Sequence, residues 1–149
     1  MSIITLLRNI LILVPVGWWC MAPAKAAEQR IVCPQEIPRQ DLRIVRAAPG
    51  WTPFVPFEYM PAMPLVSASL MFGPPSRMAI SKPDEGARHM VKWTGLRPMW
   101  DGMWMACFYG DNGRQDFILS RQIDDATIEC GVAYSKDAQK RVKLDIRCR

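Results

Sequence analysis

The chain has 149 residues, a formal net charge of +5 and a composition in which half the residues are hydrophobic. This length fits one domain with a real hydrophobic core. A nucleic-acid-binding protein normally carries a clustered basic stripe. Here only Lys140, Arg141 and Lys143 lie close together, and a solvated strand edge explains them. We therefore expect no nucleic-acid partner.

The N-terminus has the pattern of a secretory signal peptide. Arg8 precedes an apolar run from Ile10 to Trp19, and Ala24-Lys25-Ala26 is a small-x-small cleavage pattern. The apolar run is shorter than the roughly 20 residues of a comfortable membrane span. We expect a signal peptide over residues 1–26 and a single secreted β-rich domain over residues 27–149. The mature chain should have no stable membrane span and should be periplasmic or secreted.

Cleavage would leave four cysteines, namely Cys33, Cys107, Cys130 and Cys148. An even number of cysteines behind an export signal indicates disulfides, and the absence of a C-x-x-C pair argues against a zinc knuckle or a redox site. Three pairings are possible, and the sequence does not choose between them. We favour Cys107 with Cys130, which closes a moderate loop, and Cys33 with Cys148, which ties both ends of the mature chain.

The first half of the mature chain alternates between strands and proline-rich loops. A strand is expected over Asp41–Ala47, followed by an extended loop over Pro49–Pro64, because its five prolines exclude a helix or a central strand. The segment Leu65–Phe72 alternates as a strand does. Its apolar face would hold Val66, Ala68, Leu70 and Phe72, opposite Ser67 and Ser69.

Further strands are expected beyond Gly73-Pro74-Pro75. A short one covers Arg77–Ile80, a turn covers Lys82–Gly86, and another strand covers His89–Trp93. The clearest local pattern is a hairpin, in which Met103–Tyr109 and Phe117–Ser120 flank the turn residues Asp111-Asn112-Gly113. Last come Thr127–Ser135 and Arg141–Cys148. In the second of these segments one face would hold Val142, Leu144, Ile146 and Cys148, opposite Lys143, Asp145 and Arg147.

The strand Met103–Tyr109 has two apolar faces. Trp104, Ala106 and Phe108 point one way, and Met103, Met105, Cys107 and Tyr109 point the other. The strand should therefore be central and covered on both sides, with the proline-rich loop as a cover for one face. Six to eight such strands predict an all-β fold, a small disulfide-stapled sandwich or barrel of antiparallel strands.

Catalytic, metal and cofactor sites are not expected. His89 is the only histidine, and no nearby residue would make it part of a nucleophile–base pair. Methionine sulfur can bind Cu(I), and Met60, Met63, Met99, Met103 and Met105 could supply it. Methionine more often fills gaps in a core, so the core interpretation is preferred to copper.

Partner binding is the best-supported activity. Aromatic residues are enriched at protein interfaces, and the candidates are Trp51, Phe54, Phe57, Tyr59 and Trp100. We expect an exported, non-catalytic binding protein that contacts another protein of the periplasm or envelope. Its most concrete form is an inhibitor or immunity-type protein against a cell-wall hydrolase. The alternative is a structural or assembly component of the envelope.

Several short motifs follow one another in an order that resembles a family of small secreted proteins from Gram-negative bacteria with no assigned activity. The motifs are Cys33-Pro34, Pro49-Gly50-Trp51, Phe72-Gly73-Pro74-Pro75, Trp93, Trp104-x-x-Cys107-x-Tyr109 and Cys130. The resemblance implies export and transfers no functional residue.

Overall fold

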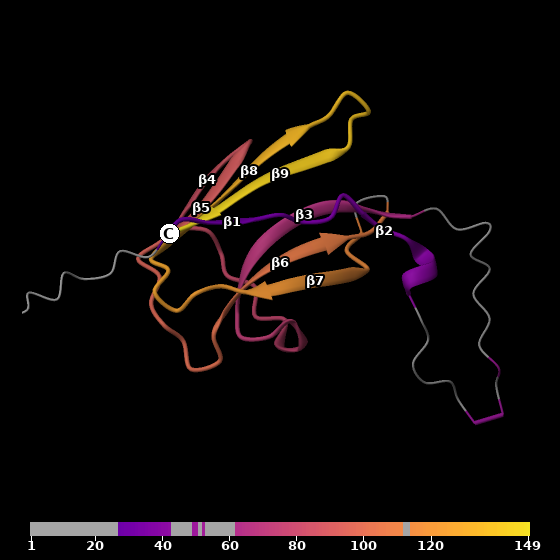
Figure 1. Ribbon diagram of the computed structural model, residues 1–149, viewed down its shortest axis with the longest axis horizontal. Helices are drawn as coiled ribbons and strands as arrows, with labels where there is room; N and C mark the ends of the chain where they lie inside the picture. The colour runs from indigo at the N-terminus through magenta and orange to yellow at the C-terminus, as the bar shows by residue number, and fades with distance from the viewer. Residues whose placement is uncertain (1–26, 43–48, 51, 53–61, 112–113) are drawn as a thin grey trace, which may run out of the picture.

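The computed structural model describes residues 27–42, 49–50, 52, 62–111 and 114–149. Within these ranges the chain forms nine strands in two antiparallel sheets, which pack as the two layers of a sandwich (Figure 1). The predicted all-β class is thus confirmed, as a sandwich and not a barrel. No helix in the described part of the chain is long and apolar enough to cross a membrane.

The first sheet has the strand order β1-β9-β8-β5-β4. The alternation expected at the C-terminus is present in β9, where Ile146 and Cys148 are buried while Lys143 and Arg147 are exposed. The bounds of the five strands are β1 (Gln29–Ile31), β9 (Val142–Cys148), β8 (Glu129–Lys136), β5 (Met90–Thr94) and β4 (Glu85–Ala87).

The second sheet has the order β2-β3-β6-β7. Its strands are β2 (Glu36–Ile37), β3 (Met63–Phe72), β6 (Met103–Tyr109) and β7 (Phe117–Gln122), and two short 3-10 helices, η1 (Arg39–Asp41) and η3 (Pro75–Arg77), interrupt the loops. The predicted hairpin is present, because β6 pairs with β7 from Tyr109 opposite Phe117 to Trp104 opposite Gln122.

The strand β6 is covered on both faces, as its sequence predicts. Its residues Met103, Met105, Cys107 and Tyr109 face the main core, where residues of the first sheet such as Trp93, Val132 and Ile146 meet them. On the opposite face Ala106 and Phe108 form a second buried cluster with Met71, against which Trp104 and Ile118 pack. The proline-rich loop, expected to cover one face, lies largely outside the described residues.

The prediction of which β3 side chains form the buried face is partly wrong. The pairing of β3 with β6 shifts between Leu65 and Ser67. A bulge places two residues opposite one and changes which side chains point inward. As a result Leu65, Ala68 and Leu70 are buried in the main core, whereas Val66 is only half-buried. Phe72, expected on the buried face, is 37% exposed at the end of the strand.

Three further segments differ from the sequence expectation. Residues 77–80 are not a strand, because the prolines before them start the 3-10 helix η3 and only Ile80 forms a bridge, with Met71. The expected turn at residues 82–86 holds the start of β4. Asp41 ends the helix η1 instead of starting a strand, and residues 43–48 lie outside the described part. Strands as short as β1 and β2 leave too few residues for alternation to be visible.

The four cysteines form two disulfides, but the expected pairing is wrong. Cys33 is bonded to Cys107, and Cys130 to Cys148. The second bond joins residues directly opposite each other on β8 and β9. Loop length suggested other partners, whereas strand register, which the sequence does not reveal, decides which cysteines meet.

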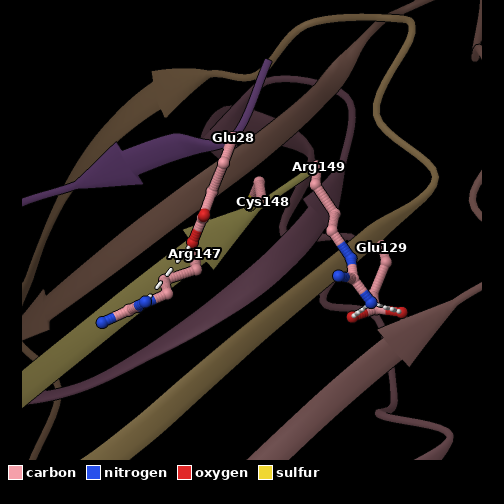
Figure 2. Close-up of a pocket in the computed structure, with 5 residues that line it drawn as sticks. All are labelled: Glu28, Glu129, Arg147, Cys148 and Arg149. Carbon is pink, nitrogen blue, oxygen red and sulfur yellow. Dashed lines mark hydrogen bonds and ion pairs between the residues drawn. The ribbon is translucent and has the colours of Figure 1, made fainter. Parts of the chain in front are cut away.

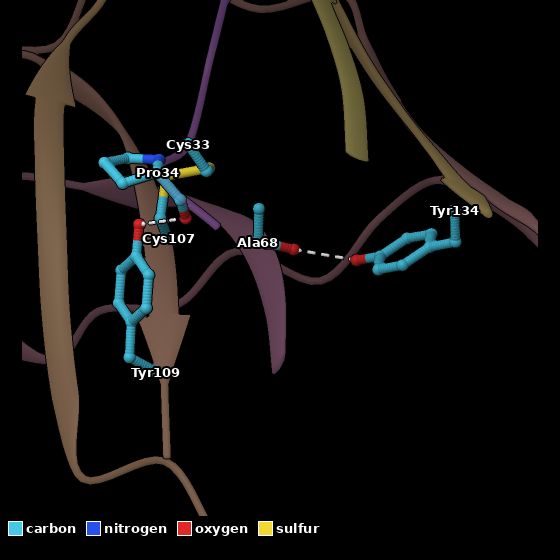
Figure 3. Close-up of a disulfide and its surroundings, with 6 residues drawn as sticks. All are labelled: Cys33, Pro34, Ala68, Cys107, Tyr109 and Tyr134. Carbon is cyan, nitrogen blue, oxygen red and sulfur yellow. Dashed lines mark hydrogen bonds between the residues drawn. A yellow bond between two sulfur atoms is a disulfide. The ribbon is translucent and has the colours of Figure 1, made fainter. Parts of the chain in front are cut away.

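The bond between Cys33 and Cys107 fixes the point where the N-terminal segment crosses between sheets. The chain leaves β1 in the first sheet and enters β2 in the second (Figure 1). At this crossing the Tyr109 hydroxyl donates a hydrogen bond to the Pro34 carbonyl at 3.0 Å (Figure 3). Two side chains of β6 therefore hold the crossing segment in place.

Candidate partner-binding surface

Two loops at one end of the sandwich lie against each other, residues 73–84 and residues 95–102. The first loop folds back on β3, because the Phe72 amide donates to the Ala79 carbonyl and the Ser81 amide donates to the Leu70 carbonyl at 2.8 Å. The buried indole of Trp93 donates to the Ser81 carbonyl at 3.2 Å. These bonds tie the loop to both sheets.

A hydrogen bond between two glycines joins the loops. The Gly73 amide donates to the Gly102 carbonyl at 2.9 Å. Both glycines have positive φ, +85° and +74°, a conformation that L side chains rarely adopt. At Gly102 a side chain would also collide with Gln122 of β7. The close approach of the loops thus depends on these two residues.

Side chains lock the second loop in the same place. Asp101 forms an ion pair with Arg77 of η3, and its carbonyl accepts a hydrogen bond from the Trp104 indole at 3.3 Å. The Arg77 guanidinium lies 4.5 Å from the centre of the Trp100 ring. Trp100 is 81% exposed, so this cation–π contact involves a solvent-facing ring and favours the orientation in which it lies over Arg77.

Exposed apolar side chains are carried by these two loops and by Phe72, the last residue of β3 before the first loop. We name them the Trp100 surface, and its members are Phe72, Met78, Ile80, Met99 and Trp100. A groove of about 240 Å³ runs beside Phe72 and Met99 and has Lys82, Asp84 and Arg97 on its walls. An exposed apolar surface with charged residues at its edge is the anatomy of a protein–protein interface.

Of the predicted contact residues, the structure places one. Trp100 lies on this surface, while Trp51, Phe54, Phe57 and Tyr59 lie outside the described residues, and their part in binding stays a prediction. Sequence reasoning missed Met78 and Ile80, because it assigned them to a strand. The prolines Pro74 and Pro75, which start a turn, were the signal against that assignment.

The residues considered for metal or catalysis lie in the main core, on the Trp100 surface (Met99) and in an exposed turn (His89), while Met60 lies outside the described residues. Met63, Met103 and Met105 are fully buried in the main core, which agrees with the core interpretation of the methionines. His89 is exposed at the turn between β4 and β5. The described residues contain no group of three or more His, Cys, Asp or Glu side chains placed to hold a metal ion.

A charged pocket of about 350 Å³ lies at the C-terminal end of β9 (Figure 2). Its charges are matched, since Arg147 pairs with Glu28 at 3.5 Å and Arg149 pairs with Glu129 at 3.2 Å. Hydrogen bonding from Lys92, and then from Arg149, lowers the pKa of Glu129. The described cations of this pocket already have carboxylate partners, so it carries no unmatched charge for a ligand.

The fold and this surface define a class: a small β-sandwich, stabilised by two disulfides, that carries an exposed apolar surface suited to protein binding. Residues 60–149 match the model of the family described as type VI secretion system Tli immunity protein. The match covers more than half of the sequence, and the chain belongs to this family. No curated protein and no solved structure shows significant similarity to it.

Family membership confirms the expected function in its general form. The chain is an immunity-type protein that acts by non-catalytic binding, and it is not an enzyme. The motifs Cys33-Pro34 and Pro49-Gly50-Trp51 lie before the matched region, so the order of short motifs noted in the sequence stays a prediction.

Proposed function

We propose that the chain is exported to the periplasm, where it neutralises a toxin effector of a type VI secretion system by binding it through the Trp100 surface. The observation that carries this proposal is Trp100, a large exposed ring that lies against the Arg77 guanidinium. Tryptophan and arginine often dominate the energy of an interface. A ring that is already ordered loses little entropy on binding.

The proposed location rests on two features. Residues 1–26 have the pattern of a signal peptide. Two disulfides persist in an oxidising compartment such as the periplasm and are rare in the cytosol. An inhibitor that is stabilised by two internal disulfides in that compartment would meet a toxin that is delivered there.

The enzyme class of the effector is a separate proposal. The family description names the secretion system and not the effector's chemistry. The cell-wall hydrolase expected from the sequence therefore stays a prediction. Membership of an immunity family favours the inhibitor over the alternative of a structural envelope component.

Protection of growth tests the proposal. The candidate effector is the product of the gene adjacent to this chain's gene, and it is directed to the periplasm of a test strain with or without the chain. The wild-type chain should restore growth. Trp100→Ala should abolish protection and weaken the purified complex by about 30-fold, as loss of an interface hot spot does. Its melting temperature should hardly change, because the ring is exposed.

The matched control is Phe117→Ala, which removes another partly exposed aromatic ring. Phe117 lies opposite Tyr109, at the other end of β6 from Trp100. It should protect as the wild type does. If Trp100→Ala protects as well as the wild type, the Trp100 surface is not the binding surface.

Digestion of purified peptidoglycan tests the target class. A cell-wall hydrolase should release soluble fragments from it, and an equimolar amount of the chain should stop the release. An effector that is neutralised by the chain but leaves peptidoglycan intact would contradict the hydrolase prediction alone.

A further inference from the structure

The inner face of the first sheet continues beyond the core along β8. On this strand Val132, Tyr134 and Lys136 share one face, since alternate residues point the same way. Val132 is buried, Tyr134 is half-buried and Lys136 is exposed. The Tyr134 hydroxyl donates to the Ala68 carbonyl of β3 at 2.9 Å (Figure 3). Beyond this contact with the second sheet, the inner face opens to solvent.

A groove of about 480 Å³ lies on this open part of the face. Tyr134 and Val142 supply its apolar lining, and the basic side chains come from two neighbouring segments. Arg88 and His89 belong to the turn between β4 and β5, and Lys136 ends β8. A hydrogen bond of 2.8 Å from the Tyr134 amide to the His89 carbonyl joins these segments.

The charge of this groove is unmatched. None of its lining residues is acidic, and neither Arg88 nor Lys136 makes an ion pair with any described residue. The pocket of Figure 2 differs, since both of its arginines are paired. An arginine and a lysine that no described carboxylate neutralises, beside an apolar floor, are complementary to a segment that carries both carboxylates and apolar side chains.

The carboxylate of Asp137, the residue after Lys136, already has bonding partners in its own hairpin. Arg141 pairs with it at 2.7 Å, and the amides of Gln139 and Arg141 donate to it at 2.9 Å each. Its partial burial would raise the pKa of Asp137, but the bonds from Arg141 and Gln139 outweigh this and lower the pKa. Asp137 is therefore bonded within its own hairpin and does not neutralise Arg88 or Lys136, so both can pair with carboxylates of a ligand.

We infer that the groove lined by Arg88, His89, Tyr134, Lys136 and Val142 is a second contact surface, which takes an acidic segment of the effector. The inference rests on the proposed function. Carboxylates of the segment pair with Arg88 and Lys136, and an apolar side chain packs on Tyr134 and Val142. The groove lies at the start of β5 and the Trp100 loop follows its end, so the two surfaces hold separate parts of the partner.

The two surfaces should act on different rate constants. Exposed charges attract an oppositely charged partner during diffusion and mainly change the association rate constant. A packed anchor such as Trp100 mainly changes the dissociation rate constant. This difference separates the groove from the Trp100 surface in a single kinetic measurement.

Stopped-flow association with the candidate effector, the product of the gene adjacent to this chain's gene, tests the inference at low and at physiological salt. Arg88→Glu and Lys136→Glu should each lower the association rate constant about tenfold at low salt and weaken its salt dependence. The control is Lys143→Glu, an exposed residue of the same hairpin on the opposite face of β9, and it should have a clearly smaller effect. Unchanged melting temperatures show that the variants are folded.

Different outcomes overturn different claims. An effector that does not bind the wild-type chain overturns the proposed function and this inference with it. An effector that binds Arg88→Glu and Lys136→Glu with the rate constant of Lys143→Glu overturns the groove alone. A further outcome is that the wild-type chain sediments with phosphatidylglycerol vesicles. If the two groove variants lose this sedimentation while their association with the effector is unchanged, the groove binds phosphate headgroups, and the inferred contact with the effector is overturned.

Discussion

The side chain of Tyr109 both fills the main core and holds the segment that crosses between the sheets. Its ring is fully buried in the main core, its hydroxyl holds the Pro34 carbonyl, and it lies on the strand that carries Cys107. Because burial disfavours the charged phenolate, the pKa of Tyr109 is raised to about 12 from its ordinary value of 10.0. The crossing of the N-terminal segment thus depends on a hydroxyl that keeps its proton.

The raised pKa predicts a loss of stability at high pH. The folded state binds the phenol proton more tightly than the unfolded state, so the contribution of Tyr109 is complete below pH 10 and is lost as pH rises toward 12. By pH 11 the loss should be about 1 kcal/mol. Denaturant unfolding of the wild type and of Tyr109→Phe at pH 8 and pH 11 measures it.

The variant Tyr109→Phe should behave differently. At pH 8 it should be about 1 kcal/mol less stable, because it loses the bond to Pro34. Between pH 8 and pH 11 it should then lose less stability than the wild type, by about 1 kcal/mol. Equal losses in both proteins would show that folding does not raise the pKa of Tyr109, because only a pKa difference between the folded and unfolded states makes stability depend on pH.

At the scale of elements, the two loops of the Trp100 surface are held together by backbone geometry. Gly73 and Gly102 meet through a hydrogen bond, and Arg77 and Asp101 lock the same contact from the side. This arrangement links the position of Trp100 to residues that do not touch a partner.

Gly102→Ala should therefore weaken both stability and binding. A side chain at positive φ costs about 1–2 kcal/mol, and here it would also displace Gln122. The expected result is a lower free energy of unfolding together with a weaker complex. Gly86→Ala is the control, because its φ is not positive and nothing lies near its Cβ position. If Gly102→Ala binds the effector as the wild type does, the loop geometry does not position Trp100.

The two disulfides should contribute unequally to stability. The bond between Cys33 and Cys107 spans 74 residues in sequence, and the bond between Cys130 and Cys148 spans 18. In the chain-entropy model these loops correspond to about 4 and about 3 kcal/mol. Double serine variants of each pair, unfolded in denaturant, should show the larger loss for Cys33 and Cys107. The reverse order would mean that loop closure is not the dominant effect.

At the scale of the whole molecule, export and oxidation should be visible together. The signal pattern predicts that the exported chain lacks residues 1–26. Its mass should also show two disulfides, and thiol titration of the denatured, unreduced protein should find no free thiol. Full-length chain recovered from the membrane fraction would contradict cleavage, and free thiols would contradict oxidation.

The charge of the molecule is divided between its surfaces. Around the C-terminus arginines and carboxylates are matched, whereas Arg88 and Lys136 in the groove beside His89 have no ion-pair partner among the described residues. The Trp100 surface is mainly apolar. A partner that contacts the last two would need an apolar patch and an acidic segment. This requirement gives the proposed effector a recognisable surface.

The sequence by itself determined the features that depend on local periodicity. Alternation in residues 103–109 predicted a central strand covered on both faces, and alternation in residues 142–148 predicted which side chains of β9 point inward. Both predictions hold because successive side chains of a strand point to opposite faces whatever its partners are. The binding role was also accessible, because a signal-peptide pattern and four further cysteines favoured a small secreted binding protein, and the family match agrees with that role.

Only the tertiary structure decided which distant residues meet. The sequence favoured Cys107 with Cys130, but strand register places Cys130 opposite Cys148 and brings Cys33 to β6. The Trp100 surface and the groove beside His89 each combine loops or turns that are far apart in the chain. Such contacts depend on strand order, on a bulge in β3 and on glycines at positive φ, and these set the long-range geometry without leaving a periodic pattern in the sequence.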